Sequence, residues 1–174
     1  MQSWLITWRT YGTWLPGQPG FVGHYRPTNG ARRIDNQFDT APADAMPQLE
    51  RYARGQLKTD PVRLCVSQAE RVRDQLGETC RYRQWSLRAV AVLTDHVHVV
   101  IRAPDTASGT DILRDLKSYS SRALNGDAGV AARWWAERGS TRKLIGDLAE
   151  AGAVEYVLGQ VSPLYLWADP EPPA

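Results

Sequence analysis

The hydrophobic residues of this chain follow two periods, one typical of strands and one typical of helices. Near the N-terminus Trp4, Ile6 and Trp8 alternate with other residues, which predicts a half-buried strand. Applied to the rest of the chain, the two periods predict a strand over 2–9, helices over 67–81, 108–124 and 144–160, and strands over 85–93, 97–102 and 133–138. The strands on either side of Thr94 and Asp95 are close enough in sequence to pair as a hairpin.

Between residues 16 and 61 the chain is rich in Pro, Gly and Asp and shows little periodicity. We expect this segment to be a long loop inserted after the first strand, with at most a short helix over 47–57. The C-terminal segment SPLYLWADPEPPA is rich in proline. There we expect residues 164–167 to dock onto the fold and residues 168–174 to form a flexible tail.

The order of the predicted elements limits the fold class. Strand, loop, helix, strand, strand, helix, strand and helix follow one another, which is typical of a split β-α-β arrangement. We therefore predict an α+β protein with a ferredoxin-like antiparallel sheet, helices on one face and an additional C-terminal helix. A length of 174 residues is consistent with one domain over 1–174.

Composition excludes several classes of protein. Hydrophobic residues make up 43% of the chain and charged residues 23%, close to globular averages, so the chain is not wholly disordered. No apolar run is long enough to cross a membrane, and the first residues lack the pattern of a signal peptide. Cys65 and Cys80 form neither a CxxC motif nor a disulfide pattern. The sequence therefore predicts a cytoplasmic protein with reduced cysteines.

The net charge of +2 conceals an uneven distribution of charge along the chain. Residues 1–34 carry four arginines and no acid, and residues 112–146 carry seven basic residues against three acidic ones. Residues 147–174 carry five acids and no base. Arginine accounts for 18 of the 21 basic residues, and its planar group suits the recognition of phosphates and bases. A GC-rich genome, whose codons favour arginine, also explains this excess, and composition alone favours that interpretation.

Two of the three histidines, His96 and His98, lie two residues apart in a predicted strand. Side chains at positions i and i+2 of a strand point to the same face, so we expect the imidazoles side by side and Val97 and Val99 in the core. Such a pair is half of a metal site, or simply two hydrogen-bonded, half-buried histidines. The remaining histidine, His24, lies in the long loop.

The last predicted helix supplies a tyrosine and an amide. Tyr156 and Gln160 lie four residues apart, about 40° around a helix, on one side of it. The predicted core stripe on the other side consists of Val154, Val157, Leu158 and Val161. A phenol is a poor nucleophile at neutral pH, but a divalent cation that polarises a phosphate compensates for this. Two imidazoles and an amide oxygen suit Mn²⁺ or Mg²⁺, although the pattern alone favours a boundary tyrosine and a solvated glutamine.

Two short segments resemble the paired motifs of the single-tyrosine HUH transposases, His–hydrophobic–His and YxxxQ. They are D-H-V-H at 95–98 and Y-V-L-G-Q at 156–160. The segments T-W-R-T-Y-G-T-W-L-P-G at 7–17 and W-W-A-E-R-G-S-T-R at 134–142 resemble the REP-associated tyrosine transposases. Leu93-Thr94 stand where the family commonly has Met-Pro, and the ending Gly159-Gln160 is closer to the insertion-sequence branch.

The resemblance implies that His96, His98 and Gln160 hold Mg²⁺ or Mn²⁺ and that Tyr156 attacks single-stranded DNA. The implied products are a 5′-phosphotyrosine link and a free 3′-hydroxyl, which later rejoins strands. Relatives recognise DNA hairpins, and some act as homodimers while others act as monomers. The expected DNA contacts are Arg9, Tyr11, Trp14, Arg114, Lys117, Ser121, Arg122, Arg138, Arg142 and Lys143.

Three alternatives stay open at this point. The chain could be a domesticated DNA- or RNA-hairpin-binding protein that no longer cuts, a replication-type nickase of the HUH class, or a small metal-dependent hydrolase that uses only the histidine pair. Tyr119, on the second predicted helix, is the competing candidate for the nucleophile. The intact set of His96, His98, Tyr156 and Gln160 favours the cutting enzyme.

Overall fold

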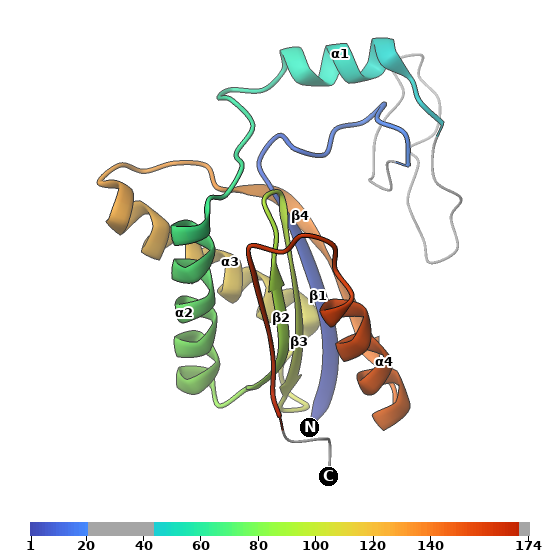
Figure 1. The fold of residues 1–174 in the computed structure, drawn as a ribbon, viewed down its shortest axis with the longest axis vertical. Helices are drawn as coiled ribbons and strands as arrows, with labels where there is room; N and C mark the ends of the chain where they lie inside the picture. The colour runs from blue at the N-terminus through green and yellow to red at the C-terminus, as the bar shows by residue number, and fades with distance from the viewer. Residues whose placement is uncertain (21–43, 171–174) are drawn as a thin grey trace. The chain divides into compact units, whose positions relative to one another are not determined.

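The structure, a computed structural model, describes residues 1–20 and 44–170. The chain divides into two compact units. The first comprises Met1–Tyr11 and the chain from Val62 onward, and it contains the sheet (Figure 1). The second comprises Gly12–Pro61. This second unit coincides with the insertion predicted over 16–61, except that it begins at Gly12.

Five strands form one antiparallel sheet in the order β4-β1-β3-β2-β5. The strands are β1 (Gln2–Thr10), β2 (Ser86–Val92), β3 (His96–Ala103), β4 (Trp135–Leu144) and β5 (Tyr165–Ala168). The first four strands have the order of a ferredoxin-like sheet, and β5 is an additional strand beside β2. The predicted fold class is therefore confirmed.

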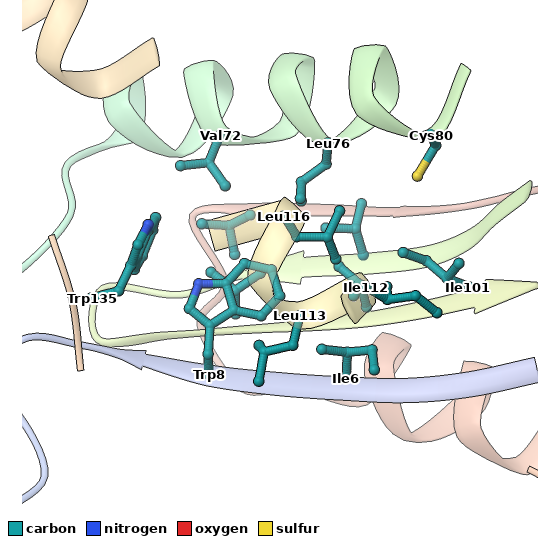
Figure 2. Close-up of a cluster of buried hydrophobic side chains, with 14 of the residues drawn as sticks. Ile6, Trp8, Val72, Leu76, Cys80, Ile101, Ile112, Leu113, Leu116 and Trp135 are labelled. Carbon is teal, nitrogen blue, oxygen red and sulfur yellow. The ribbon is translucent and has the colours of Figure 1, made fainter. Parts of the chain in front are cut away.

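The helices of the first unit cover both faces of this sheet (Figure 1). They are α2 (Val66–Arg83), α3 (Gly109–Ala128) and α4 (Asp147–Leu158). On the face covered by α2 and α3, Ile6 and Trp8 of β1 pack with Leu76 and Leu116 in the main buried cluster (Figure 2). The ring of Trp8 meets that of Trp135 edge to face, with centroids 5.9 Å apart, so the predicted core position of Trp8 is confirmed. None of the helices formed by the described residues is long and apolar enough to cross a membrane.

A second, smaller buried cluster lies on the opposite face, between the sheet and α4. Its members are Ala89, Ala91, Leu93, Val100, Leu144, Ala153 and Val157. Most of these side chains are small, so α4 lies on a thin apolar layer. This is also the face to which the even-numbered residues of β3 point.

Two element boundaries near the C-terminus differ from the prediction. The strand predicted over 133–138 is β4, which continues to Leu144 because residues 140–144 pair with β1 although they are mostly polar. An edge strand with exposed side chains lacks the apolar alternation that marks a strand in sequence. Gly146 then adopts a φ of 80°, in the left-handed region, and α4 begins at Asp147 rather than at Leu144.

The apolar stripe predicted for this helix is only partly correct. Val157 is fully buried, but Leu158 is 40% exposed and Val161 is 83% exposed. The helix ends at Leu158, so the helical spacing does not continue to Val161. The buried side of α4 consists instead of Glu150, Ala153 and Val157, at positions i, i+3 and i+7.

The C-terminal segment is more ordered than predicted. The expected docking of residues 164–167 is confirmed by β5, but the tail predicted from residue 168 begins too early. Ala168 pairs with Ala89 of β2, and the backbone N–H of Asp169 donates to the carbonyl of Arg88 at 2.8 Å. These backbone hydrogen bonds fix the chain beyond the predicted start of the tail, and residues 171–174 lie outside the described residues.

The second unit contains α1 (Pro47–Gly55), which is the short helix predicted over 47–57. Gly17, with a φ of 94°, packs against the start of this helix, where a Cβ atom would lie 2.4 Å from the backbone nitrogen of Glu50. The backbone N–H of Met46 donates to the carbonyl of Gly17 at 2.8 Å. A larger residue at position 17 would therefore displace the first turn of α1.

Candidate active site

The two histidines and Tyr156 lie together on the α4 side of the sheet. His96 and His98 begin β3 and point to one face, as predicted, while Val97 and Val99 are buried on the other face. The imidazole centroids are 4.7 Å apart, with an angle of 87° between the rings. The ring of Tyr156 lies 5.3 Å from that of His98, edge to face. The structure thus brings together three residues that come from two separate sequence motifs.

Each histidine uses its Nδ1 atom within the protein. His98 Nδ1 lies 2.7 Å from Thr7 Oγ1, and His96 Nδ1 lies 2.6 Å from Asp95 Oδ1. Such contacts fix the orientation of an imidazole and leave its Nε2 atom for a metal ion. Sequence reasoning missed the role of Thr7, because Thr7 is placed opposite His98 only by the register of β1 and β3. The role of Asp95 was missed as well, although this residue begins the D-H-V-H motif.

Burial and nearby charges control the ionisation of these groups. Burial is the main reason that the pKa of His98 falls from 6.5 to about 4, and the positive charges of His96 and Arg9 act in the same direction. His98 is therefore neutral at pH 7, the form that binds a cation. The hydrogen bond with His96 is the main reason that the pKa of Asp95 lies below its usual range. Asp95 is thus ionised, and its Oδ2 accepts from Arg9 Nη1 at 3.2 Å.

Arg9 and Tyr156 are the groups of this site that a ligand would meet. The Tyr156 side chain is an exposed part of α4, with 52% of its surface accessible. Arg9 lies opposite His96 in the β1–β3 register. Burial lowers the pKa of Arg9, while attraction to Asp95 and to an ionised Tyr156 opposes that effect. The Arg9 guanidinium therefore places positive charge where a phosphate or a phenolate would benefit from it.

Gln160 lies just beyond the end of α4. Its Nε2 atom donates to the carbonyl of Tyr156 at 3.0 Å, which leaves Oε1 as the atom for a cation. Among the described residues, no hydrogen bond or ring contact joins Gln160 to His96 or His98. Within the same part of the chain, no group of three or more His, Cys, Asp or Glu side chains is placed to hold a metal ion. His24 lies outside the described residues.

Two imidazoles and one amide oxygen fill only part of the coordination shell of Mn²⁺ or Mg²⁺. Mg²⁺ typically keeps several waters and binds substrate phosphates. The Nδ1 contacts of His96 and His98 and the neutral state of His98 prepare both rings as ligands. The residues therefore fit a cation whose remaining positions are filled by water and a phosphate.

Four of the predicted DNA contacts lie on α3, on the face of the sheet away from the histidines. They are Arg114, Lys117, Ser121 and Arg122. Arg114 is exposed and paired with Asp111 at 2.8 Å. Arg122 is exposed and lies over the ring of Tyr119, with its guanidinium carbon 5.1 Å from the ring centroid. Tyr119, the competing nucleophile, therefore also lies on the helix layer opposite the histidines.

Lys117 contacts the backbone of β4 and the residues around it. Its Nζ donates to the carbonyls of Ala136 at 2.6 Å and Glu137 at 2.9 Å. Burial lowers the pKa of Lys117, and the charge of Glu137 opposes that effect. This side chain therefore joins α3 to β4, and it would have to leave these carbonyls in order to bind a phosphate.

Three other predicted contacts, Arg138, Arg142 and Lys143, are exposed on β4, at the edge of the sheet. Arg142 lies opposite Leu5 in the register, which places it on the histidine face. Lys143 lies opposite Trp4, which places it on the face covered by α2 and α3. The edge strand therefore presents basic side chains on both faces of the sheet.

The two aromatic residues predicted to stack on bases differ in their surroundings. Tyr11 is only 8% exposed and lies under the guanidinium of Arg133, whose central carbon is 5.1 Å from the ring centroid. Trp14 is half-buried in the second unit. A base would reach the face of Tyr11 only after Arg133 moved, and the stacking role of both residues stays a prediction.

Comparisons with known proteins show which family model and which folds this chain is similar to. Residues 63–139 match the family model described as "Transposase IS200 like", a range that includes the histidine pair and ends before Tyr156. A search of curated proteins found no match. The fold is similar to that of a REP-associated tyrosine transposase bound to a REP hairpin, with 12% identity, a TM-score of 0.50, and coverage of 90% of this chain and 64% of that one. A candidate transposase from Deinococcus radiodurans R1 shows 15% identity, coverage of 90% and 89%, and a TM-score of 0.46.

This chain therefore spans 64% of the length of the first of these structures, and that similarity concerns the fold. The family match concerns the sequence and covers the segment from Arg63 to Gly139. The predicted resemblance to the IS200-like transposases is therefore confirmed over residues 63–139, and the similarity to the REP-associated tyrosine transposase is one of fold.

Proposed function

We propose that the chain is a metal-dependent transposase that nicks single-stranded DNA and transfers the strand through Tyr156. The observation that carries this proposal is the contact of Tyr156 with the histidine pair on one face of the sheet. The Tyr156 ring lies 5.3 Å from that of His98, which in turn lies 4.7 Å from that of His96. A small-molecule hydrolase would need no tyrosine at this place. The exposed phenol, next to two prepared metal ligands, is the arrangement that attack on a polymeric phosphodiester requires.

In the proposed reaction the Tyr156 oxygen attacks the phosphorus of a phosphodiester. The new bond joins the phenol oxygen to the 5′-phosphate, and the bond from phosphorus to the 3′ oxygen breaks. The phenol loses its proton, and the released 3′ oxygen gains one to become a hydroxyl. The phosphotyrosine conserves the energy of the phosphodiester, so the reverse attack by a 3′-hydroxyl joins strands without a nucleotide cofactor.

His96, His98 and Gln160 are the residues that would hold Mg²⁺ or Mn²⁺. When bound, a divalent cation supplies charge stabilisation at the phosphate under attack. Thr7 and Asp95 hold the two imidazoles in orientation, through contacts of 2.7 and 2.6 Å. Arg9 would provide further positive charge beside the phosphate.

We propose that the DNA substrate contains a hairpin beside the single-stranded cleavage site. One similar structure is that of a transposase bound to a REP hairpin. In this chain β4 presents Arg142 on the histidine face and Lys143 on the opposite face. A duplex stem that contacts this edge would lie close to both faces, and its phosphates would meet the exposed arginines of α3.

The test of this proposal is the formation of a covalent protein–DNA adduct. The protein is incubated with single-stranded DNA from the flanks of its own gene, including any hairpin repeats, with Mg²⁺ or Mn²⁺ and with EDTA as a control. We expect a denaturation-resistant adduct only with the cation, and peptide mapping should place the DNA on Tyr156. An adduct on Tyr119, or one that forms equally well in EDTA, would contradict the proposal.

Replacing Lys117 by methionine should reduce stability rather than DNA affinity. The variant loses the contacts of Nζ with the carbonyls of Ala136 and Glu137, so we expect the free energy of unfolding to fall by about 1–3 kcal/mol. The matched control is Arg122→Gln on the exposed side of α3, which should change stability by less than about 0.5 kcal/mol.

Denaturant titrations and DNA titrations at several salt concentrations separate these two roles. The DNA association constant K falls as salt is added. Arg122→Gln should reduce the steepness of the plot of log K against log salt by about 1, whereas Lys117→Met should leave it unchanged. If Lys117→Met reduces the steepness and leaves stability intact, Lys117 is a phosphate contact after all.

A further inference from the structure

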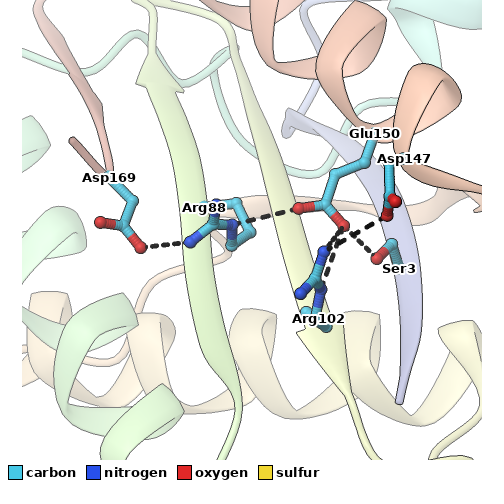
Figure 3. A network of polar contacts seen from close by, with 6 residues as sticks. All are labelled: Ser3, Arg88, Arg102, Asp147, Glu150 and Asp169. Atoms are coloured by element: carbon cyan, nitrogen blue, oxygen red, sulfur yellow. Dashed lines mark hydrogen bonds and ion pairs between the residues drawn. The ribbon is translucent and has the colours of Figure 1, made fainter. Parts of the chain in front are cut away.

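A buried carboxylate of α4, six residues before Tyr156, makes several polar contacts with the sheet. Glu150 is only 1% exposed. It accepts hydrogen bonds from Ser3 Oγ, from Arg88 Nε at 3.1 Å, and from Arg102 Nε and Nη2 at 3.2 and 3.0 Å (Figure 3). These partners belong to β1, β2 and β3. One side chain of α4 is thus held by three neighbouring strands.

The partners of Glu150 are themselves fixed. The Arg88 guanidinium also pairs with Asp169, just after β5 (Figure 3). Burial raises the pKa of Glu150, but the hydrogen bonds from Ser3, Arg102 and Arg88 and the charge of Arg102 lower it by more. Glu150 is therefore ionised at neutral pH, and a buried charge of this kind is tolerated only while its partners stay in place.

We call the contacts of Glu150 with Ser3, Arg88 and Arg102 the polar clamp. This polar clamp and the candidate active site share two elements, β3 and α4. Along β3, His98 and Arg102 are four residues apart, about 13 Å, and they point to the same face. Along α4, Tyr156 and Glu150 are six residues apart, about 9 Å. The polar and aromatic contacts of the helix with β3 are thus Tyr156 against His98 and Glu150 against Arg102. A rotation or shift of α4 at one of these contacts must move the other.

Apolar packing does little to fix this helix. Its buried apolar residues are Ala153 and Val157, with Ala149 and Val154 partly buried beside them, whereas Leu148 is 92% exposed and Leu158 is 40% exposed. Small, smooth side chains allow a helix to rotate or slide at little cost, while a carboxylate with four directional hydrogen bonds does not. The hydrogen bonds of Glu150 therefore restrict rotation and sliding of α4 in a way that its thin apolar layer does not.

We propose that Glu150 is a positioning residue, whose contacts with Arg88, Arg102 and Ser3 hold α4 so that Tyr156 faces His98 of the same chain. This inference rests on the proposed role of Tyr156 as the nucleophile. Glu150 does not touch the substrate. It acts by keeping the phenol close to the place of attack, where a displacement of about 1 Å costs roughly 100-fold in rate.

The experiment compares Glu150→Gln with Glu155→Gln, which removes an exposed acid from the same helix. The rate of adduct formation is measured in a single turnover at saturating single-stranded DNA, and the Kd for the same DNA is measured separately. We expect Glu150→Gln to slow the reaction by about 10- to 100-fold with Kd within about 2-fold of wild type. Glu155→Gln should leave both within about 2-fold of wild type.

Hydrogen exchange without DNA provides a second measurement. In Glu150→Gln the amides of α4 should exchange about 10-fold faster or more, while those of β1 and β3 keep their protection. If α4 exchange is unchanged, or if the rate loss follows a weaker Kd, Glu150 does not position the helix. Should Glu150→Gln fail to fold, Arg102→Lys keeps the charge but loses the paired N–H contacts, and it should show the same changes to a smaller degree; wild-type rate and exchange in that variant overturn the proposal.

This design separates the failure of the two proposals. If the wild-type protein forms no adduct, the proposed function fails, while hydrogen exchange still decides whether Glu150 docks α4. If the wild-type protein forms the adduct and Glu150→Gln forms it at the same rate, the function stands and the positioning role is wrong.

Discussion

The Tyr156→Phe variant should form no covalent adduct with single-stranded DNA, a loss of at least about 10⁴-fold, because it lacks the oxygen that attacks the phosphate. The phenylalanine ring can keep the edge-to-face contact with His98, where the centroids are 5.3 Å apart. Tyr156 is 52% exposed, so the substitution changes the buried surface area little. We therefore expect the free energy of unfolding to change little and the Kd for hairpin DNA to stay within about 2-fold of wild type.

Tyr119→Phe is the matched control, because Tyr119 lies on α3, on the other face of the sheet from the histidines. This variant should form the adduct at the wild-type rate. A denaturing gel with labelled DNA measures the adduct, and a binding titration of the same DNA measures the Kd. Persistence of the adduct in Tyr156→Phe, together with its loss in Tyr119→Phe, would move the nucleophile to α3.

The parts of this site that sequence could predict depend on local backbone geometry. The common face of His96 and His98 follows from the alternation of any strand, and it holds whichever strands lie next to β3. The burial of Val97 and Val99 follows from the same rule. Placing Tyr156 beside this pair came from the resemblance between motifs, since no local period connects a helix to a distant strand.

The parts that sequence could not predict depend on how distant segments pair. Thr7 reaches His98 only through the register of β1 and β3, and the polar half of β4 is a strand only because it lies beside β1. Glu150 is one of three acids in its helix, and a glutamate in a helix is typical of a solvated position. Its burial depends on Arg88 and Arg102. The distribution of charge along the sequence predicted no role for either arginine.

Lowering the pH from 7 to 5 in the absence of metal should reduce the free energy of unfolding by about 2 kcal/mol through His98 alone. The unfolded chain binds a proton at this residue with a pKa of 6.5, whereas burial and the charges of His96 and Arg9 lower the pKa in the folded state to about 4. Between these values the unfolded state holds more protons, so stability is lost as the pH falls. Urea titrations with EDTA at pH 7, 6 and 5 measure the change.

The His98→Asn variant is the control for this prediction, because its side chain does not titrate and its amide is able to contact Thr7 Oγ1. It should lose less than about 0.5 kcal/mol over the same range. Asp95 and Glu150 have lowered pKa values, so the stability that they contribute is lost only below about pH 4.5 and does not enter this window. Adding Mn²⁺ should steepen the wild-type dependence, since a cation and a proton compete for the same Nε2 atom. If the wild-type stability is flat between pH 7 and 5, or if His98→Asn shows the same loss, then His98 is not the buried neutral ligand that the proposed site requires.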